Sequence, residues 1–157
     1  IRELLEKQSD LVIVWPVHVN PKVRQVVHAA FENMPTVISE RIYLTQPLNY
    51  STMVWLLKKA WLVLTDSGGI QEETTYLGIP CLTFRDSTER PVTVTLGTNQ
   101  LLADLDPQKT YQALEKILAG EVKKGSIPPL WDGNAAERIA NTLHGIFEKK
   151  SFHANGQ

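Results

Sequence analysis

Apolar runs alternate with amphipathic stretches along the whole chain. Continuous apolar runs are typical of strands that are covered on both faces, and they occupy residues 11–15 and 61–64. Residues 41–44 and 81–84 are also predicted to be strands, and residues 100–102 to be a last short strand. Between these runs, apolar residues recur at helical spacing, which predicts helices at residues 1–8, 22–32, 50–59, 70–77, 106–118 and 135–149.

This alternation predicts an α/β fold in which a parallel sheet carries helices on both faces. Because connections between parallel strands are right-handed, a doubly wound sheet is the simplest arrangement. The length of 157 residues suits one ordinary domain. We assign residues 1–150 to this domain and expect residues 151–157 to form a polar tail.

Polar residues follow each of the first four predicted strands. His18 follows the first strand, residues 46–49 the second, residues 67–73 the third and residues 85–90 the fourth. In doubly wound sheets, ligands bind beyond the carboxyl ends of the strands. Four polar clusters on one rim therefore favour a ligand crevice over a solvated surface.

The third cluster has the pattern of an anion site. Ser67, Gly68 and Gly69 lie between a buried strand and a helix predicted to begin at Ile70. Backbone N–H groups and the helix dipole at such a turn suit a phosphate, although the lysine of a P-loop is missing. Ser67 is either a helix cap or a phosphate donor. We place Glu72 and Glu73 in the first helical turn, where they are either dipole-compatible acids or a carboxylate for two ribose hydroxyls.

Three basic side chains on the rim have two interpretations each. His18 is either a neutral loop histidine bonded to backbone or a group that holds a diphosphate. Arg85 and Arg90 flank a polar loop, so each either holds that loop through Asp86 or Glu89 or binds phosphate in a bidentate manner.

Composition excludes several other classes of function. The net charge of −1 gives no support to nucleic-acid or anionic-membrane binding. Cys81 is the single cysteine, in a segment predicted to be a buried strand, so we interpret it as a packing residue. The histidines lack metal-ligand spacing, and no apolar segment is long enough to span a bilayer. We therefore expect no metal, no cofactor and a cytoplasmic location.

Three motifs together resemble the non-hydrolysing UDP-N-acetylglucosamine 2-epimerases. They are the segment from Asp66 to Glu73 followed by Leu77-Gly78-Ile79-Pro80, the segment from Arg85 to Pro91 followed by Gly97-Thr98-Asn99, and the histidine loop from Pro16 to Pro21. The resemblance covers nearly the whole chain in the right order. It implies a Rossmann-like domain that forms the C-terminal, nucleotide-binding half of a two-domain GT-B architecture, with the N-terminal domain absent from this chain.

The resemblance also implies roles for individual residues. Ser67, Gly68 and Gly69 would contact the diphosphate of UDP, and Glu73 would bind the ribose hydroxyls. His18 would lie near the phosphates as a residue needed for activity.

Two further loops receive roles in the same way. The loop from Arg85 to Arg90 would close over the diphosphate and the sugar, so Arg85 and Arg90 join the UDP-binding set. The loop from Gln46 to Asn49 would lie near the uracil.

The family's reaction inverts C2 of the sugar and gives UDP-N-acetylmannosamine, by elimination of UDP to a glycal and re-addition. In the family, the base and acid at C2 come from the N-terminal domain, so we expect this chain alone to be inactive. The resemblance implies that the full-length protein is an isomerase and a homodimer, and that it serves polysaccharide biosynthesis. Two alternatives remain open at this point: the donor domain of a GT-B glycosyltransferase, and a nucleotide-sugar binding module without chemistry. Ser87, Val92 and Trp131 depart from the family's pattern.

Overall fold

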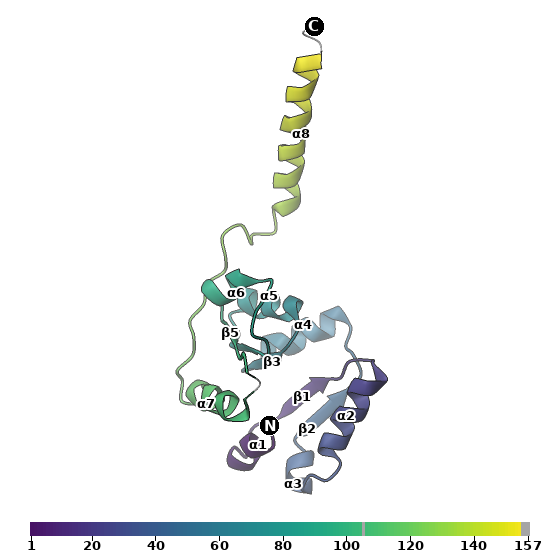
Figure 1. Cartoon of the computed structure of the whole chain (residues 1–157), viewed down its shortest axis with the longest axis vertical. Coiled ribbons are helices and arrows are strands. Elements are labelled where there is room, and N and C mark those ends of the chain that lie inside the picture. Colours follow the sequence, from purple (N-terminus) through teal and green to yellow (C-terminus); the bar gives the residue numbers. More distant parts are fainter. Residues whose placement is uncertain (105, 155–157) are drawn as a thin grey trace. The chain divides into compact units, whose positions relative to one another are not determined.

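The chain divides into two compact units, Ile1–Lys59 and Ala60–Gln157 (Figure 1). The computed structural model describes the backbone of residues 1–104 and 106–154, and the side chains of residues 1–104 and 106–147.

The first unit is built around two parallel strands. Its elements are α1 (Arg2–Lys7), β1 (Ile13–Pro16), α2 (Pro21–Phe31), α3 (Thr36–Ser39), β2 (Ile42–Thr45) and α4 (Tyr50–Lys59). Ile13 pairs with Ile42, and Pro16 pairs with Thr45. Buried apolar side chains from the four helices, together with Val17 after β1, form the core of this unit: Leu4, Leu5, Val17, Val27, Ile38 and Leu57.

Local sequence signals explain where α2 begins and how α1 is held. The side chain of Asn20 accepts a hydrogen bond from the Lys22 amide at 3.0 Å, and Pro21 occupies the first helical turn. The guanidinium of Arg41 donates to the carbonyl oxygen of Gln8 at 2.6 Å and also to that of Leu5. This arginine therefore satisfies orphan carbonyls at the end of α1.

The second unit is built around three parallel strands. Its elements are β3 (Val63–Thr65), α5 (Gly68–Leu77), β4 (Cys81–Thr83), α6 (Pro91–Thr95), β5 (Asn99–Leu101), α7 (Pro107–Leu118) and α8 (Ala135–Ala154). The strand order is β3-β4-β5, and Cys81 pairs with both Val63 and Asn99. All three residues of β4 are buried, as expected for the central strand of a parallel sheet.

The predicted α/β class with parallel strands is confirmed. The described strands fall into one sheet of two and one sheet of three, so a single doubly wound sheet remains a proposal. The helices at 50–59 and 107–118 have nearly the predicted bounds, whereas α3 and α6 were not predicted. Cys81 is fully buried, and burial raises the pKa of its thiol, in agreement with a packing residue.

Two predicted helix boundaries are wrong. Helix α5 begins at Gly68 and not at Ile70, because Ser67 with its extended backbone occupies the N-cap position. Helix α8 continues to Ala154, through the first residues of the expected tail; residues 155–157 of that tail lie outside the described part. The other end of α5 follows its sequence signal, since Gly78 adopts a left-handed conformation with φ of 71°.

Candidate functional site

The N-terminus of α5 presents backbone donors at the carboxyl end of β3. Ser67 is the N-cap residue, yet its side chain makes no capping hydrogen bond, while its amide donates to Thr65 Oγ1 at 3.0 Å. The N–H groups of the first helical residues have no acceptor within the helix, and the dipole makes this end partially positive. The Ser67 hydroxyl is therefore available to a ligand together with the amides of Gly68 and Gly69, which is the geometry of an anion site.

The two glycines have different surroundings. A Cβ placed on Gly69 would meet no heavy atom within 4 Å, so the space beside its backbone is open. A Cβ on Gly68 would lie 3.0 Å from Glu89 Oε1 and 4.0 Å from Arg90 Cγ. The loop that carries the two predicted arginines therefore lies against the N-terminus of α5.

Glu72 and Glu73 do not lie in the first turn of α5, which contradicts the expectation from the sequence. Since the helix begins at Gly68, the first turn holds no acidic residue. Glu72 forms an ion pair with Arg90, whose Nε lies 3.0 Å from Glu72 Oε1 without the alignment of a hydrogen bond. Burial, and next the neighbouring Glu72 carboxylate, raise the pKa of Glu73.

The segment from Arg85 to Arg90, here called the arginine loop, connects β4 to α6. Arg85 Nη1 lies 3.6 Å from Glu89 Oε2, so one of the two intraloop pairings expected from the sequence is present. Arg90 pairs outside the loop, with Glu72. All four of these side chains are more than a third exposed, and such ion pairs contribute little stability. Either guanidinium can therefore exchange its carboxylate for a phosphate.

Beneath the arginine loop lies a set of buried polar side chains that the sequence analysis missed. Gln71, Thr83, Thr93 and Asn99 are fully buried. Gln71 Oε1 accepts hydrogen bonds from Thr88 Oγ1 at 2.7 Å and from Asn99 Nδ2 at 3.0 Å. Their signal in the sequence is weak: Thr83 and Thr93 are polar positions next to apolar neighbours.

His18 belongs to the first unit and lies two residues after the end of β1. It is exposed, and its Nδ1 accepts a hydrogen bond from the Asn20 amide at 3.1 Å. In a neutral ring this leaves the proton on Nε2, which can then donate to a ligand. The six other predicted site residues belong to the second unit.

The loop from Gln46 to Asn49 also belongs to the first unit. Asn49 Oδ1 accepts from the Thr52 amide at 2.9 Å and so caps α4. Gln46 is bonded through its Oε1 to Arg24. These contacts fix both ends of the loop.

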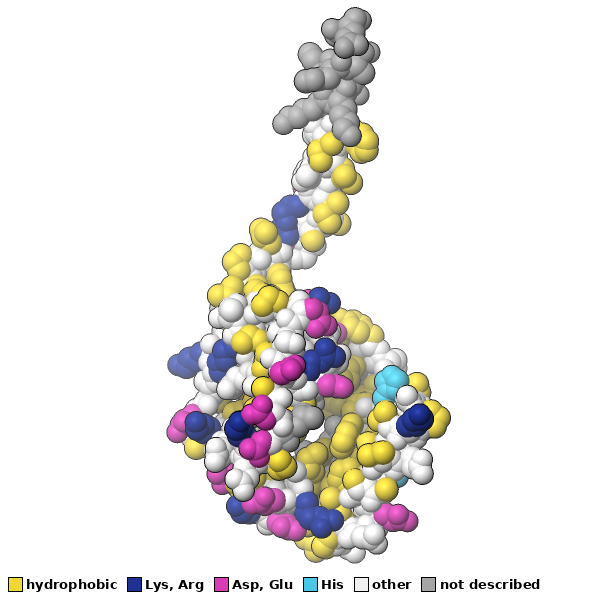
Figure 2. Space-filling view, viewed as in Figure 1, with side chains coloured by type: hydrophobic (Ala, Val, Ile, Leu, Met, Phe, Trp, Pro, Cys, Tyr) yellow, Lys and Arg dark blue, Asp and Glu magenta, His cyan; other side chains and the backbone are white. Residues whose placement is uncertain are grey.

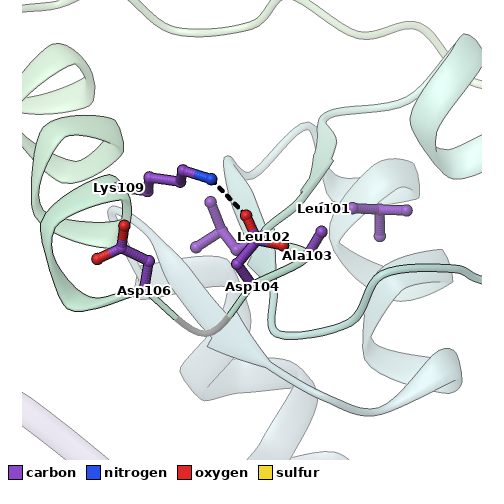
Figure 3. A pocket seen from close by; sticks show the side chains of 6 residues that line it. All are labelled: Leu101, Leu102, Ala103, Asp104, Asp106 and Lys109. Carbon is purple, nitrogen blue, oxygen red and sulfur yellow. Dashed lines mark hydrogen bonds and ion pairs between the residues drawn. The ribbon is translucent and has the colours of Figure 1, made fainter.

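A hollow of about 230 Å³ lies beside the end of β5 (Figure 3). It is lined by Leu101, Leu102, Ala103, Asp104, Asp106 and Lys109. Lys109 and Asp104 are paired with each other across it. None of the predicted site residues lines this hollow, and the polar groups in it are already paired, so we do not assign it a ligand.

The surface distribution of charged side chains agrees with the net charge of −1. Acidic and basic side chains are interspersed on the face drawn in Figure 2. Among residues 1–104 and 106–147, no three His, Cys, Asp or Glu side chains are grouped so that they could hold a metal ion. No helix in the described part of the chain is both long and apolar enough to cross a bilayer.

Comparison with known proteins gives one consistent family. A family model described as UDP-N-acetylglucosamine 2-epimerase matches residues 1–144. The UDP-N-acetylglucosamine 2-epimerase of Escherichia coli K12 is 40% identical over 147 residues, which are 91% of this chain and 38% of that protein. The enzyme of the same name from Bacillus subtilis 168 is also 40% identical, over 91% of this chain and 37% of its own length.

Solved structures agree with the sequence comparison. UDP-GlcNAc 2-epimerase from Neisseria meningitidis, bound to UDP-GlcNAc, has a TM-score of 0.79 and 33% identity over 91% of this chain and 38% of its own. The S. aureus MnaA-UDP co-structure has a TM-score of 0.80 and 36% identity over 94% and 40%. The chain thus spans well under half the length of the relatives it matches.

Proposed function

Because the chain belongs to the UDP-N-acetylglucosamine 2-epimerase family, we propose that it is the C-terminal, UDP-binding half of an enzyme that interconverts UDP-N-acetylglucosamine and UDP-N-acetylmannosamine. In this proposal the two units together form one Rossmann-like, doubly wound domain of residues 1–150, and a second domain supplies the other half of a GT-B architecture. The match covers only 38% of the length of the E. coli relative, which supports a second domain outside this chain.

The observation that carries the proposal is the open N-terminus of α5 beside the arginine loop. The Ser67 hydroxyl makes no cap bond, the side of Gly69 is open, and two side chains of the arginine loop lie near the Cβ position of Gly68, Glu89 through Oε1 at 3.0 Å and Arg90 through Cγ at 4.0 Å. A diphosphate carries negative charge that both the helix dipole and arginine favour. Ser67, Gly68 and Gly69 would bind its oxygens, and Arg85 and Arg90 would neutralise its charge.

The two glutamates of α5 take different roles. Glu72 is paired with Arg90 of the arginine loop. Glu73 has no such partner described, and its raised pKa reflects partial burial beside Glu72. A carboxylate that accepts two vicinal ribose hydroxyls gains charge-assisted hydrogen bonds, which would compensate for this burial. We therefore assign the ribose to Glu73.

In the proposed reaction, this half of the enzyme would stabilise UDP as the leaving group. A base removes the proton at C2 while the bond between C1 and the UDP oxygen breaks, which gives a glycal and UDP. A proton then adds at the opposite face of C2, and UDP adds back at C1. Donors fixed around the diphosphate lower the energy of the charge that develops on it, and His18 would donate through Nε2. The base and the acid at C2 would come from the second domain.

Product analysis on the protein of natural length tests this function. With UDP-N-acetylglucosamine in D₂O, we expect a mixture with UDP-N-acetylmannosamine, and deuterium from solvent at C2 of the product. Sugar transfer that requires an added acceptor, without deuterium at C2, would instead indicate a glycosyltransferase. Binding of UDP-sugar without any product would indicate a binding module.

A further inference from the structure

We propose that Gln71, Thr88 and Asn99 are positioning residues, which hold the arginine loop over the N-terminus of α5 and thereby set the affinity for the diphosphate. This inference rests on the proposed function, because it assigns the loop's target to that same anion site. None of the three residues would touch the ligand.

Five hydrogen bonds close a ring that joins the loop to the core of the second unit. Thr88 Oγ1 donates to Gln71 Oε1 at 2.7 Å, and the Arg90 amide donates to Thr88 Oγ1 at 3.0 Å. Thr93 Oγ1 donates to the Arg90 carbonyl oxygen at 2.7 Å. Asn99 Nδ2 completes the ring by donating to Thr93 Oγ1 at 3.1 Å and to Gln71 Oε1 at 3.0 Å.

The ring is anchored in the sheet. Asn99 is the first residue of β5, and its Oδ1 accepts from Thr83 Oγ1 of β4 at 2.6 Å. Gln71, Asn99 and Thr83 are fully buried. The bonds between Asn99 and its partners Gln71, Thr93 and Thr83 are therefore buried, where hydrogen bonds are stronger than at the surface, and the bonds of Thr88 and Arg90 are partly buried.

The position of Arg90 depends on this ring more than on its own ion pair. Both its backbone amide and its carbonyl oxygen belong to the ring. Its contact with Glu72 is between two side chains that are each more than 40% exposed. This contact lacks an aligned hydrogen bond, whereas two hydrogen bonds hold the backbone of Arg90 at Thr88 and Thr93.

The chemistry of Gln71 argues for a role beyond packing. Its Nε2 is buried and has no hydrogen-bond partner among the described residues. Burial of an unpaired polar group is unfavourable, so an apolar side chain would suit a purely structural position better. The side-chain oxygen of Gln71 makes the hydrogen bonds, since it accepts one from Thr88 and one from Asn99.

Matched threonine substitutions in the protein of natural length separate positioning from stability. Thr88→Val removes one corner of the ring. Thr98→Val is the control, because the Thr98 hydroxyl likewise makes a partly buried hydrogen bond, to the Ile79 carbonyl oxygen at 2.6 Å, outside the ring. Thr88→Ser keeps the hydroxyl and is the conservative rescue. Each variant is titrated with UDP and with uridine, and amide hydrogen exchange is followed at Arg90.

We expect Thr88→Val to weaken UDP binding about tenfold, as for the loss of one or two hydrogen bonds, and to leave uridine binding unchanged. Exchange of the Arg90 amide should accelerate in the same variant. Thr88→Ser should behave like the wild type, and Thr98→Val should lower the melting temperature without a change in the ratio of the two affinities. Gln71→Met should reproduce Thr88→Val, and the double variant should be no weaker than either single one.

Equal ratios of UDP to uridine affinity in Thr88→Val and Thr98→Val would overturn the proposal, as would unchanged exchange at Arg90. Failure of the proposed function has a different signature, namely a wild-type protein that does not prefer UDP to uridine. The exchange measurement needs no ligand, so it decides in either case whether the ring holds the loop.

Discussion

Arg90 Nε lies 3.0 Å from Glu72 Oε1, and this pair distinguishes two glutamates that are adjacent in the sequence. Both are half-buried on α5. The pair commits Glu72 to the arginine loop, and it leaves Glu73 for a ligand. The different chemistry of the two residues leads to predictions that separate the ribose from the diphosphate.

Substitution of Glu73 should lower the affinity for every ligand that contains the ribose. We expect Glu73→Ala to weaken UDP and uridine alike, by about 1–2 kcal/mol, the loss of charge-assisted hydrogen bonds. Glu72→Ala is the matched control: it frees Arg90 for the diphosphate, so it should leave uridine binding unchanged and should not weaken UDP binding. Calorimetric titration of both variants with both ligands measures the difference. An unchanged affinity in Glu73→Ala would remove this residue from the ribose site.

The raised pKa of Glu73 predicts a pH-dependent effect on stability. The folded state binds this proton more tightly than the unfolded state, whose carboxyl has a pKa of about 4.5. Stability therefore falls as the pH rises from 4.5 through the folded pKa, and the loss is complete above it. We expect Glu73→Gln to melt at a higher temperature than the wild type at neutral pH, and the difference to disappear below pH 4.5. A difference that is the same at both pH values would contradict this cause.

The open side of Gly69 predicts a substitution that separates folding from binding. A Cβ there meets no protein atom within 4 Å, so Gly69→Ala should leave stability unchanged or raise it by up to about 1 kcal/mol. The same methyl group would occupy the space proposed for the diphosphate, and UDP affinity should fall about tenfold, as expected for a lost close approach of backbone to ligand. Gly145→Ala is the control, since its Cβ is also unobstructed and it lies in α8. It should not change UDP affinity.

Glu89 should oppose ligand binding. Its Oε1 lies 3.0 Å from the Cβ position of Gly68, at the end of the helix where we place the diphosphate. Glu89→Gln removes a like charge and frees Arg85, so UDP should bind about two- to fivefold more tightly, the scale of a charge at a helix terminus. Glu115→Gln makes the same change of net charge on α7. Tighter binding in both variants would indicate a general effect of net charge instead.

The sequence predicts the order of the elements because each one has a local signal. Asn20 before Pro21 and Gly78 after Leu77 mark helix ends that the structure confirms. The start of α5 was predicted two residues late because Gly68 and Gly69 resemble a turn, although Ser67 is the N-cap residue. Because of the late start, the sequence prediction places Glu72 and Glu73 in the first turn of the helix, whereas they lie in the second.

The buried ring was not predictable in the same way. Its bond between Gln71 and Asn99 joins residues 28 positions apart. No periodic pattern marks such a pair, because each partner is only one polar residue in its own segment. The candidate site residues, by contrast, are proposed from compact motifs, and the experiments above test their roles.

The most direct test of the account is a calorimetric titration of the natural-length protein with UDP, with uridine as the control ligand. The account predicts saturable binding of UDP and binding of uridine that is at least about tenfold weaker, because the diphosphate supplies the contacts at Ser67, Gly68 and Gly69. Equal affinities for the two ligands, or no binding of UDP, would contradict the claim that the N-terminus of α5 is a diphosphate site.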